Sequence, residues 1–224
     1  MKRTRVGGQL LTALGLTSLV SVGLYLISAY YYGAQPFWFL VWNLVLAWLP
    51  LLLAIALIRY LKNQPWVSGS GAALTVLWLA FLPNSFYLIS DLVHLGYAPS
   101  SQTLYYVIML FSFSFNGLIL GCLSLYLLHI ELLKRLRART AHLYIGLVLL
   151  LCSFAVYLGR YLRWSTWDII FHPIGVVFDV SDRIINPVAY GQTFQVTLLF
   201  FVLIVSIYFT LWHIVLAARK LPRA

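Results

Sequence analysis

The segment Ala72–Leu95, AALTVLWLAFLPNSFYLISDLVHL, is long enough and apolar enough to cross a bilayer as a helix. Its second half nevertheless carries polar or helix-perturbing residues, among them Pro83, Asn84, Tyr87, Ser90, Asp91 and His94. A charge at the centre of a membrane helix costs about 2.5–3.5 kcal/mol on insertion scales, so such groups usually have a function or a partner. Helical spacing puts four of the side chains on one stripe: Asn84, Tyr87, Asp91 and His94. We therefore expect this stripe to face protein or water and not lipid.

The composition of the whole chain is that of an integral membrane protein. Of its 224 residues, 62% are hydrophobic and only 9% are charged, whereas a soluble domain has about 25% charged residues. The net charge of +10 would suit a nucleic-acid partner. However, the basic residues lie in short clusters between apolar segments, as the positive-inside bias predicts, so we expect no nucleic-acid binding. The predicted fold class is an all-α, polytopic membrane helix bundle that forms one domain over residues 1–224.

Six segments meet the requirement of about 20 apolar residues for a membrane span. They are roughly residues 8–32, 37–60, 72–95, 103–130, 142–162 and 193–216. The first follows a basic N-terminus and so resembles a signal peptide. Its apolar run is too long for a signal-peptide core, and no small-residue cleavage site follows it. We therefore expect it to remain as the first span.

The basic residues alternate between the connections and so predict the topology. Twelve of the fifteen fall on one side of the six spans: Lys2, Arg3, Arg5, Arg59, Lys62, Lys134, Arg135, Arg137, Arg139, Arg219, Lys220 and Arg223. The opposite connections at 33–36 and 96–102 carry none. Because basic loops stay in the cytoplasm, both termini are predicted to be cytoplasmic.

The longest connection, residues 163–192, contains a second pattern. Within 175–186, four polar residues share one helical face: Asp179, Asp182, Arg183 and Asn186. Apolar residues occupy the rest of the helix, and Pro173 and Pro187 bracket it. This pattern predicts a short amphipathic helix at the outer membrane interface. Two roles stay open for it, a membrane-surface anchor or a lid over the mouth of the bundle.

Two arginines at the outer end of the fifth span, Arg160 and Arg163, oppose the positive-inside bias. Arg160 lies within one helical turn of the boundary, where a guanidinium needs a carboxylate partner or must extend to the headgroups. Asp91 is the only acid in the outer half of a span, and it falls at a similar depth. We therefore predict that Asp91 pairs with Arg160 or Arg163, because the planar guanidinium suits a carboxylate.

Two acid–histidine pairs are candidates for metal binding or acid–base chemistry. Asp91 and His94 are spaced i, i+3, and Asp168 and His172 are spaced i, i+4. Such spacings are common by chance, so we predict neither a metal nor a cofactor. His94, Asp91 and Asp168 remain candidate catalytic residues, since a histidine can titrate near neutral pH. The sequence contains no nucleophile elbow, zinc-protease motif, phosphate-binding loop or dinucleotide fingerprint.

The remaining polar groups within the spans have mainly structural interpretations. Three amides lie at outer or middle depth: Asn43, Asn84 and Asn116. Each is expected to bond between helices, worth about 0.6 kcal/mol on average, unless all three converge on Asp91. At the inner side, four residues have the spacing of ion pairs at a helix end: His129, Glu131, Lys134 and Arg135. We assign no chemistry to these four.

Three stretches together resemble one known family. They are Trp42-Asn43 with AWLP at 47–50, LPNSFYLISDLVHL at 82–95, and GRYLRWSTWD at 159–168. They are similar to the bacterial membrane family labelled domain of unknown function 1361, whose hallmarks read roughly L-P-N-A-P-Y-x-x-T-D-L-x-H-L and G-R-x-x-R-W-N-S-W-D. The resemblance implies a multi-pass protein of a bacterial plasma membrane and supplies no activity. It also implies that eight residues belong together: Asn84, Tyr87, Asp91, His94, Arg160, Arg163, Trp167 and Asp168.

The leading hypothesis is an outward-facing polar site between the third and fifth spans. Arg160 and Arg163 would hold an anionic group, from a small solute or a lipid headgroup, and Asp91 would orient them. A second hypothesis is a membrane-embedded enzyme acting on a lipid-linked substrate, with acid–base chemistry by His94 and Asp91 or Asp168. A third is a structural or accessory subunit. The almost wholly apolar inner halves of the spans count against a transporter, and the only partner that the sequence indicates is membrane lipid.

Overall fold

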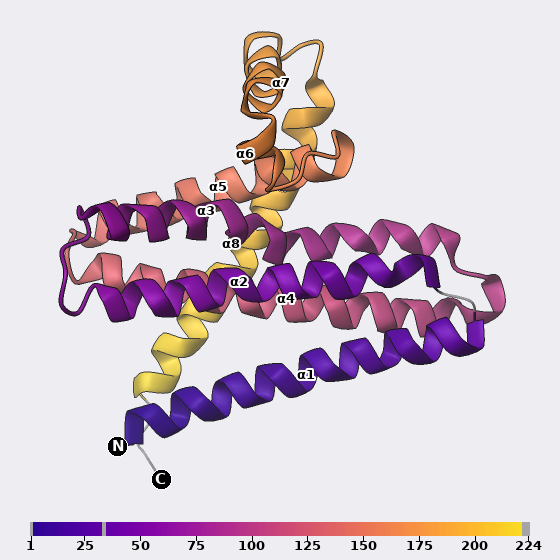
Figure 1. Cartoon of the computed structure of the whole chain (residues 1–224), viewed down its shortest axis with the longest axis horizontal. Coiled ribbons are helices and arrows are strands. Elements are labelled where there is room, and N and C mark those ends of the chain that lie inside the picture. Colours follow the sequence, from indigo (N-terminus) through magenta and orange to yellow (C-terminus); the bar gives the residue numbers. More distant parts are fainter. Residues whose placement is uncertain (1, 33–34, 221–224) are drawn as a thin grey trace.

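The computed structural model describes residues 2–32 and 35–220, and it contains only helices within these ranges (Figure 1). In chain order the α-helices are α1 (Lys2–Tyr32), α2 (Phe39–Tyr60), α3 (Gly69–Ser90), α4 (Thr103–Leu133), α5 (Ala138–Tyr161), α6 (Asp168–Phe171), α7 (Pro173–Ile185) and α8 (Gly191–Lys220). Short 3-10 helices η1 (Gln35–Trp38), η2 (Asp91–Tyr97) and η3 (Ser100–Gln102) lie in the connections before α2 and α4.

Six of these helical segments are long and apolar enough to cross a membrane. The chain is therefore a multi-pass membrane protein, and the predicted all-α bundle is confirmed. The third segment differs from the prediction, which extended one helix to Leu95. The α-helix ends at Ser90 and continues as the 3-10 helix η2. Because the 3-10 helix is more tightly wound, Asp91 and His94 stand on a different winding from Asn84 and Tyr87.

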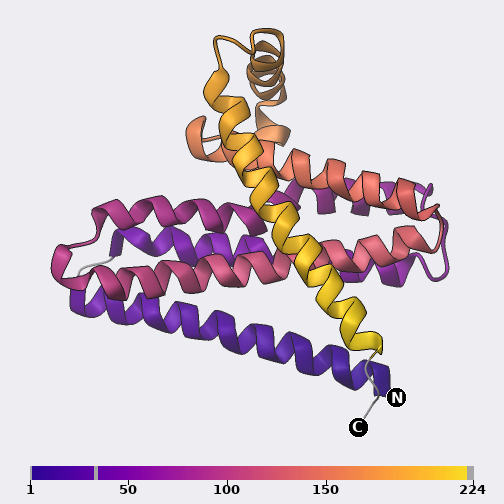
Figure 2. The ribbon, with the colours of Figure 1, turned by 180° about the vertical axis from the view of Figure 1, so that it is seen from behind.

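The helices α1 to α5 run alongside one another, and α8 crosses them obliquely (Figures 1 and 2). Both views place the start of α1, the end of α8 and the connections α2–α3 and α4–α5 at the same end of the molecule. The α4–α5 connection carries Lys134, Arg135 and Arg137, and the α2–α3 connection carries Lys62, so we call this end the basic end. The short helices α6 and α7 project from the bundle beyond the last turn of α5.

Close packing between α3 and α4 fixes the centre of the bundle. A Cβ atom added to Gly117 would lie 2.4 Å from the carbonyl oxygen of Ser85, and one added to Gly121 would lie 2.9 Å from the Phe86 ring. Small residues allow membrane helices to approach this closely. The Ser85 hydroxyl then donates to the carbonyl of Ala47 on α2 at 2.9 Å. The three helices α2, α3 and α4 therefore form one packed unit.

We expect Gly117→Ala to lower the free energy of unfolding by about 1–3 kcal/mol, because the added methyl group overpacks this contact. Gly146→Ala on α5 is the matched control, since nothing lies within 4 Å of its added Cβ. The control should be stabilising by about 0.5–1 kcal/mol through helix propensity. Reversible unfolding of the two purified variants, followed by circular dichroism, measures both effects. Equal changes in the two variants would refute the close contact.

Asn116 attaches α1 to α4 and does not join the polar residues of α3. Its Nδ2 donates to the Ser21 hydroxyl at 2.9 Å, and its Oδ1 accepts from Thr17 at 2.8 Å. Ser18 on the same face of α1 accepts from the Trp48 indole of α2 at 3.1 Å. The alternative in which three amides converge on Asp91 is therefore wrong for Asn116, which has the structural role.

Candidate functional site

A cavity of about 740 Å³ lies between α2, α3 and α5 and extends to the segment that joins α5 to α7. Cavities of about 300–1,000 Å³ are typical of small-molecule sites. Seven of the eight residues singled out in the sequence line it: Asn84, Tyr87, Asp91, His94, Arg160, Arg163 and Trp167. The lining also includes Asn43 of α2. The eighth residue, Asp168, is not part of the lining.

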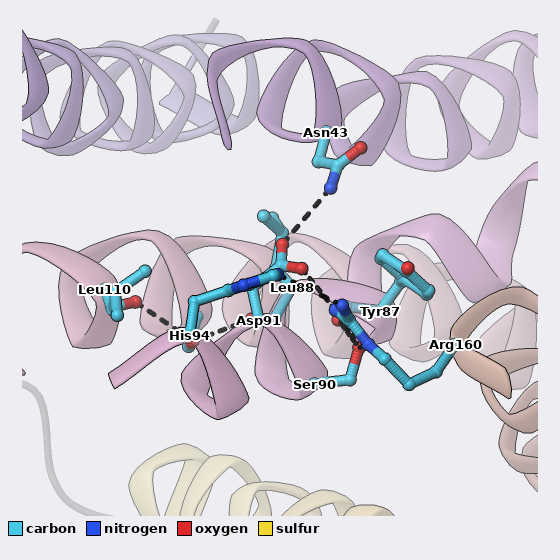
Figure 3. A network of polar contacts seen from close by, with 9 residues as sticks. Asn43, Tyr87, Leu88, Ser90, Asp91, His94, Leu110 and Arg160 are labelled. Atoms are coloured by element: carbon cyan, nitrogen blue, oxygen red, sulfur yellow. Dashed lines mark hydrogen bonds and ion pairs between the residues drawn. The ribbon is translucent and has the colours of Figure 1, made fainter. Parts of the chain in front are cut away.

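The buried carboxylate of Asp91 is the centre of the polar network (Figure 3). Its side chain is 1% exposed and forms an ion pair with Arg160. The other carboxylate oxygen accepts a hydrogen bond of 3.1 Å from Asn43 Nδ2. The predicted pairing with an arginine of the fifth span is thus confirmed for Arg160. Through Asp91, the end of α3 is tied to both α2 and α5.

Arg160 is held by several groups besides Asp91. Its Nε and Nη2 donate to the Ser90 hydroxyl at 3.0 and 2.7 Å, and its Nη1 lies 3.2 Å from His94 Nε2. The guanidinium carbon stands 4.6 Å from the centre of the Tyr87 ring, in a cation–π contact. Since a guanidinium only donates, His94 Nε2 must be the acceptor. Arg160 is therefore a fixed part of the cavity wall, and the lone pair of His94 Nε2 is engaged.

Arg163 lies in the same wall of the cavity as Arg160, but its backbone conformation and its contacts differ. It follows the end of α5 with φ = 60°, in the left-handed region that glycine usually occupies at a helix C-terminus. The amide of Trp164 donates to the carbonyl of Leu158 at 3.3 Å, so the chain turns back over the last turn of α5. Arg163 is exposed, lines the cavity and has no hydrogen bond or ion pair with any residue that the structure describes. Its charge is thus available to a ligand.

Asp168 has a local structural role. Its carboxylate accepts from the amide and the hydroxyl of Ser165 at 2.7 and 2.6 Å, and it pairs with His172 at 3.2 Å. The hydrogen bonds from Ser165 keep the pKa of Asp168 below its usual value. The carboxylate thus closes the turn that precedes α6. The two acid–histidine pairs weighed in the sequence do not converge, because only Asp91 and His94 line the cavity.

The segment between α5 and α6 is fastened to α3 beside Pro83. Asn84 Nδ2 donates to the Thr166 hydroxyl at 3.0 Å and to the carbonyl of Phe81 at 3.0 Å. Trp167 packs edge-on against Phe81, with 6.0 Å between the ring centres. Pro83 has no amide hydrogen and so removes one hydrogen bond from α3. The contacts of Thr166 and Trp167 lie against the helical turn that contains it. Thr166 was not singled out in the sequence, because its partner lies 82 positions away.

The predicted amphipathic helix is α7, and its polar face is turned toward the protein. Asp179 accepts from the Trp164 indole at 2.7 Å, and Arg183 is only 7% exposed. Val176 reaches the cavity lining. The apolar side chains on the other face are exposed, including Ile174 at 84% and Phe178 at 71%. This helix therefore covers one edge of the cavity, and its placement at a membrane surface stays a prediction.

The hydrogen bonds that hold the connection between α7 and α8 should make its stability depend on pH. Asp182 accepts from the Tyr190 hydroxyl at 2.5 Å and from Asn186 Nδ2 at 2.8 Å. These bonds lower the pKa of Asp182 in the folded protein. A lowered pKa stabilises the fold above the unfolded value of about 3.9, and this contribution is lost as the pH falls through the folded pKa.

We therefore expect the amides of Ala189 and Tyr190, which donate to the carbonyl of Asn186, to lose hydrogen-exchange protection as the pH falls below about 4 and through the lowered pKa of Asp182. Protection factors corrected for intrinsic exchange provide the measurement. Asp182→Asn removes the titrating group, so its protection should change much less over this range. The same pH dependence in both proteins would rule out Asp182 as the cause.

A histidine pair that was not predicted from the sequence lies near the basic end, with His129 buried and His142 exposed. His129 Nε2 of α4 lies 2.8 Å from His142 Nδ1 of α5, and His129 Nδ1 lies 2.8 Å from the Tyr208 hydroxyl of α8. The Trp212 ring stacks on His129 with 4.2 Å between centres. The cluster joins three helices. The ion pairs predicted at this end are confirmed, because Glu131 contacts Lys134 and Arg135 at 2.5 and 3.0 Å.

A signal for the histidine pair was present in the sequence. His129 precedes the end of α4 by the same number of positions as His142 follows the start of α5. In an antiparallel helical hairpin, residues equally far from the connection lie at the same level. The sequence interpretation grouped His129 with Glu131, Lys134 and Arg135 at the helix end and did not include His142.

Comparison with known proteins places this cavity within a family. Neither the curated proteins nor the solved structures contain a match to the chain. Residues 42–209 match the family described as "Protein of unknown function (DUF1361)". The matched part runs from α2 into α8 and includes every residue of the cavity lining except Phe39. The match covers most of the chain, and the protein belongs to the DUF1361 family.

Proposed function

We propose that the cavity between α2, α3 and α5 binds an anionic group, with Arg163 as its direct contact. Arg160, fixed by Asp91, would form the second cationic wall of the site. Charge-assisted hydrogen bonds from a guanidinium to a phosphate or carboxylate are short and strong. The site would lie at the outer face of a bacterial plasma membrane, because the connections at the opposite end carry the basic clusters of a cytoplasmic side.

The observation that carries this proposal is the contrast between the two arginines. Asp91 balances Arg160 within the wall, whereas Arg163 lines the same cavity with no counter-charge among the described residues. In addition, Arg163 occupies a left-handed backbone position. Backbone strain of this kind clusters at functional sites and ligand clamps. A bound anion would neutralise the free charge and account for an arginine where glycine is favoured.

The two alternatives are less well supported. Acid–base catalysis by His94 and Asp91 needs a free lone pair on His94, whereas Nε2 already accepts from Arg160. Asp91 is only 1% exposed and is bound on both oxygens, so it has little access to a substrate. A purely structural or accessory role accounts for the Asp91–Arg160 pair and leaves the free guanidinium of Arg163 unexplained.

Titration of the purified protein with inorganic phosphate, followed by calorimetry, tests the proposal. We expect Arg163→Gln to weaken phosphate binding by at least tenfold. Arg137→Gln is the matched control, because Arg137 is an exposed arginine at the start of α5 near the basic end. The control should bind phosphate as the unaltered protein does. Equal loss in both variants, or no phosphate binding by the unaltered protein, would contradict an anion site at Arg163.

A further inference from the structure

The cavity has two chemically different halves along α5. Arg160 and Arg163 form its polar end, together with Asn84 of α3 and Thr166 of the segment between α5 and α6. Toward the basic end, one face of α5 supplies apolar side chains: Val148, Leu151, Cys152, Ala155 and Leu158. Leu46 of α2 and Leu79 of α3 complete this apolar half. A small soluble anion would use only the polar end and leave the apolar half unfilled.

The apolar half has the length of one lipid leaflet. Val148 and Arg160 lie at the two limits of the α5 lining, and the rise of 1.5 Å per residue separates them by about 18 Å. The hydrocarbon core of a bilayer is about 30 Å thick, so one leaflet contributes about 15 Å. A hydrocarbon chain whose polar head contacts the arginines would therefore extend to about the level of Val148.

The cavity is also open at its side within the membrane-spanning part. Leu151 lies in the middle of α5 and is 53% exposed although it lines the cavity. On the wall formed by α2, Trp42 lines the cavity and is 49% exposed. A lining side chain this exposed shows that the cavity is open to its surroundings, and the surroundings of a membrane helix at mid-span are hydrocarbon. A lipid could pass this edge without its chain leaving the hydrocarbon.

We infer that the ligand of this site is an anionic amphiphile that enters from the bilayer, with its charged head at Arg163 and one hydrocarbon chain along α5 between Ala155 and Val148. This inference rests on the proposed function, because the same arginines hold the head. It adds the chemical class of the ligand, a chain-bearing lipid or lipid-linked anion, and the direction of entry.

Native mass spectrometry with added dioleoyl phosphatidylglycerol, using dioleoyl phosphatidylcholine as the neutral competitor, tests the inference. Ala155→Trp fills the apolar half below the arginines and should reduce phosphatidylglycerol retention by at least tenfold while inorganic phosphate binds as before. Leu143→Trp is the matched control on the same helix, because Leu143 is 74% exposed and lies outside this lining. Leu151→Gln is a second variant at an exposed position that needs no extra volume, and it should also reduce retention.

The outcomes separate the inference from the proposed function. Loss of lipid retention in Ala155→Trp and Leu151→Gln, with phosphate binding kept, supports a chain along α5. Unchanged lipid retention in both variants would overturn the inference. Phosphate binding without preference for phosphatidylglycerol would also overturn it and would leave the anion site standing. If the unaltered protein binds neither phosphate nor phosphatidylglycerol, the proposed anion site itself is contradicted, and the inference is overturned with it.

Discussion

Replacement of Asp91 by alanine is expected to lower the free energy of unfolding by about 3–5 kcal/mol. Removal of one partner from a buried ion pair has this cost because the other charge is stranded. Asp91 is 1% exposed, and its partner Arg160 would be left in the cavity wall with only neutral acceptors. The bond from Asn43 would be lost as well. Reversible unfolding of the purified protein in detergent measures the change.

A double-mutant cycle with Arg160→Met separates the ion pair from the loss of packing. The double variant should cost clearly less than the sum of the two single variants, because neither charge is then left unpaired. Asp168→Ala is the matched control, since its carboxylate is more exposed than that of Asp91 and, among the described residues, contacts only Ser165 and His172 in its own segment. The control should unfold close to the unaltered protein. Additive effects at Asp91 and Arg160, or equal effects at Asp91 and Asp168, would be incompatible with a buried pair at the centre of the fold.

Arg163→Gly is expected to stabilise the protein and, at the same time, to weaken anion binding. The left-handed conformation costs a non-glycine residue roughly 1–2 kcal/mol, and Arg163 adopts it at φ = 60°. Glycine removes this cost, so the unfolding temperature should rise. Hydrogen bonds to a charged group contribute about 1.5–3 kcal/mol, so phosphate affinity should fall by about 10- to 100-fold. Thermal unfolding and phosphate titration of the same preparation test both effects.

Arg163→Asn separates the two effects, because asparagine tolerates the left-handed region better than other side chains but carries no charge. It should have nearly unaltered or slightly raised stability and the same loss of phosphate affinity as the glycine variant. A destabilised Arg163→Gly would show that the arginine side chain supports the fold. Retained phosphate affinity in both variants would remove Arg163 from the site.

The membrane spans and the ion pair of the site could be predicted from the sequence, because both depend on patterns within short segments of the chain. Hydrophobic length located the spans, and the isolated charge of Asp91 at the depth of Arg160 predicted an ion pair. The choice between Arg160 and Arg163 could not be predicted. It depends on the turn after Tyr161, where Arg163 adopts a left-handed backbone conformation and Arg160 alone reaches Asp91. That conformation gives no pattern in the sequence when glycine is absent.

Other features depended on contacts between distant segments. Asp168 was grouped with the site because it follows the arginines in one motif, yet its hydrogen bonds close a local turn. Asn116 has the same side-chain chemistry as the other two amides, but its side of α4 faces α1. Which face a helix presents to which neighbour is set by packing of the whole bundle. Hydropathy alone gives little information about it, because lipid-facing and helix-facing residues are both apolar.

The most direct test of the central claim is a distance between the bound anion and Arg163. Solid-state NMR of the protein with 15N-labelled arginine and inorganic phosphate measures the dipolar coupling between 31P and the guanidinium nitrogens. Charge-assisted contacts of 2.7–2.9 Å between nitrogen and oxygen correspond to a phosphorus–nitrogen distance of about 4 Å. We expect this coupling in the unaltered protein and its loss in Arg163→Gln, with the Asp91–Arg160 pair intact. A coupling that persists unchanged in Arg163→Gln, or none in the unaltered protein, would contradict it.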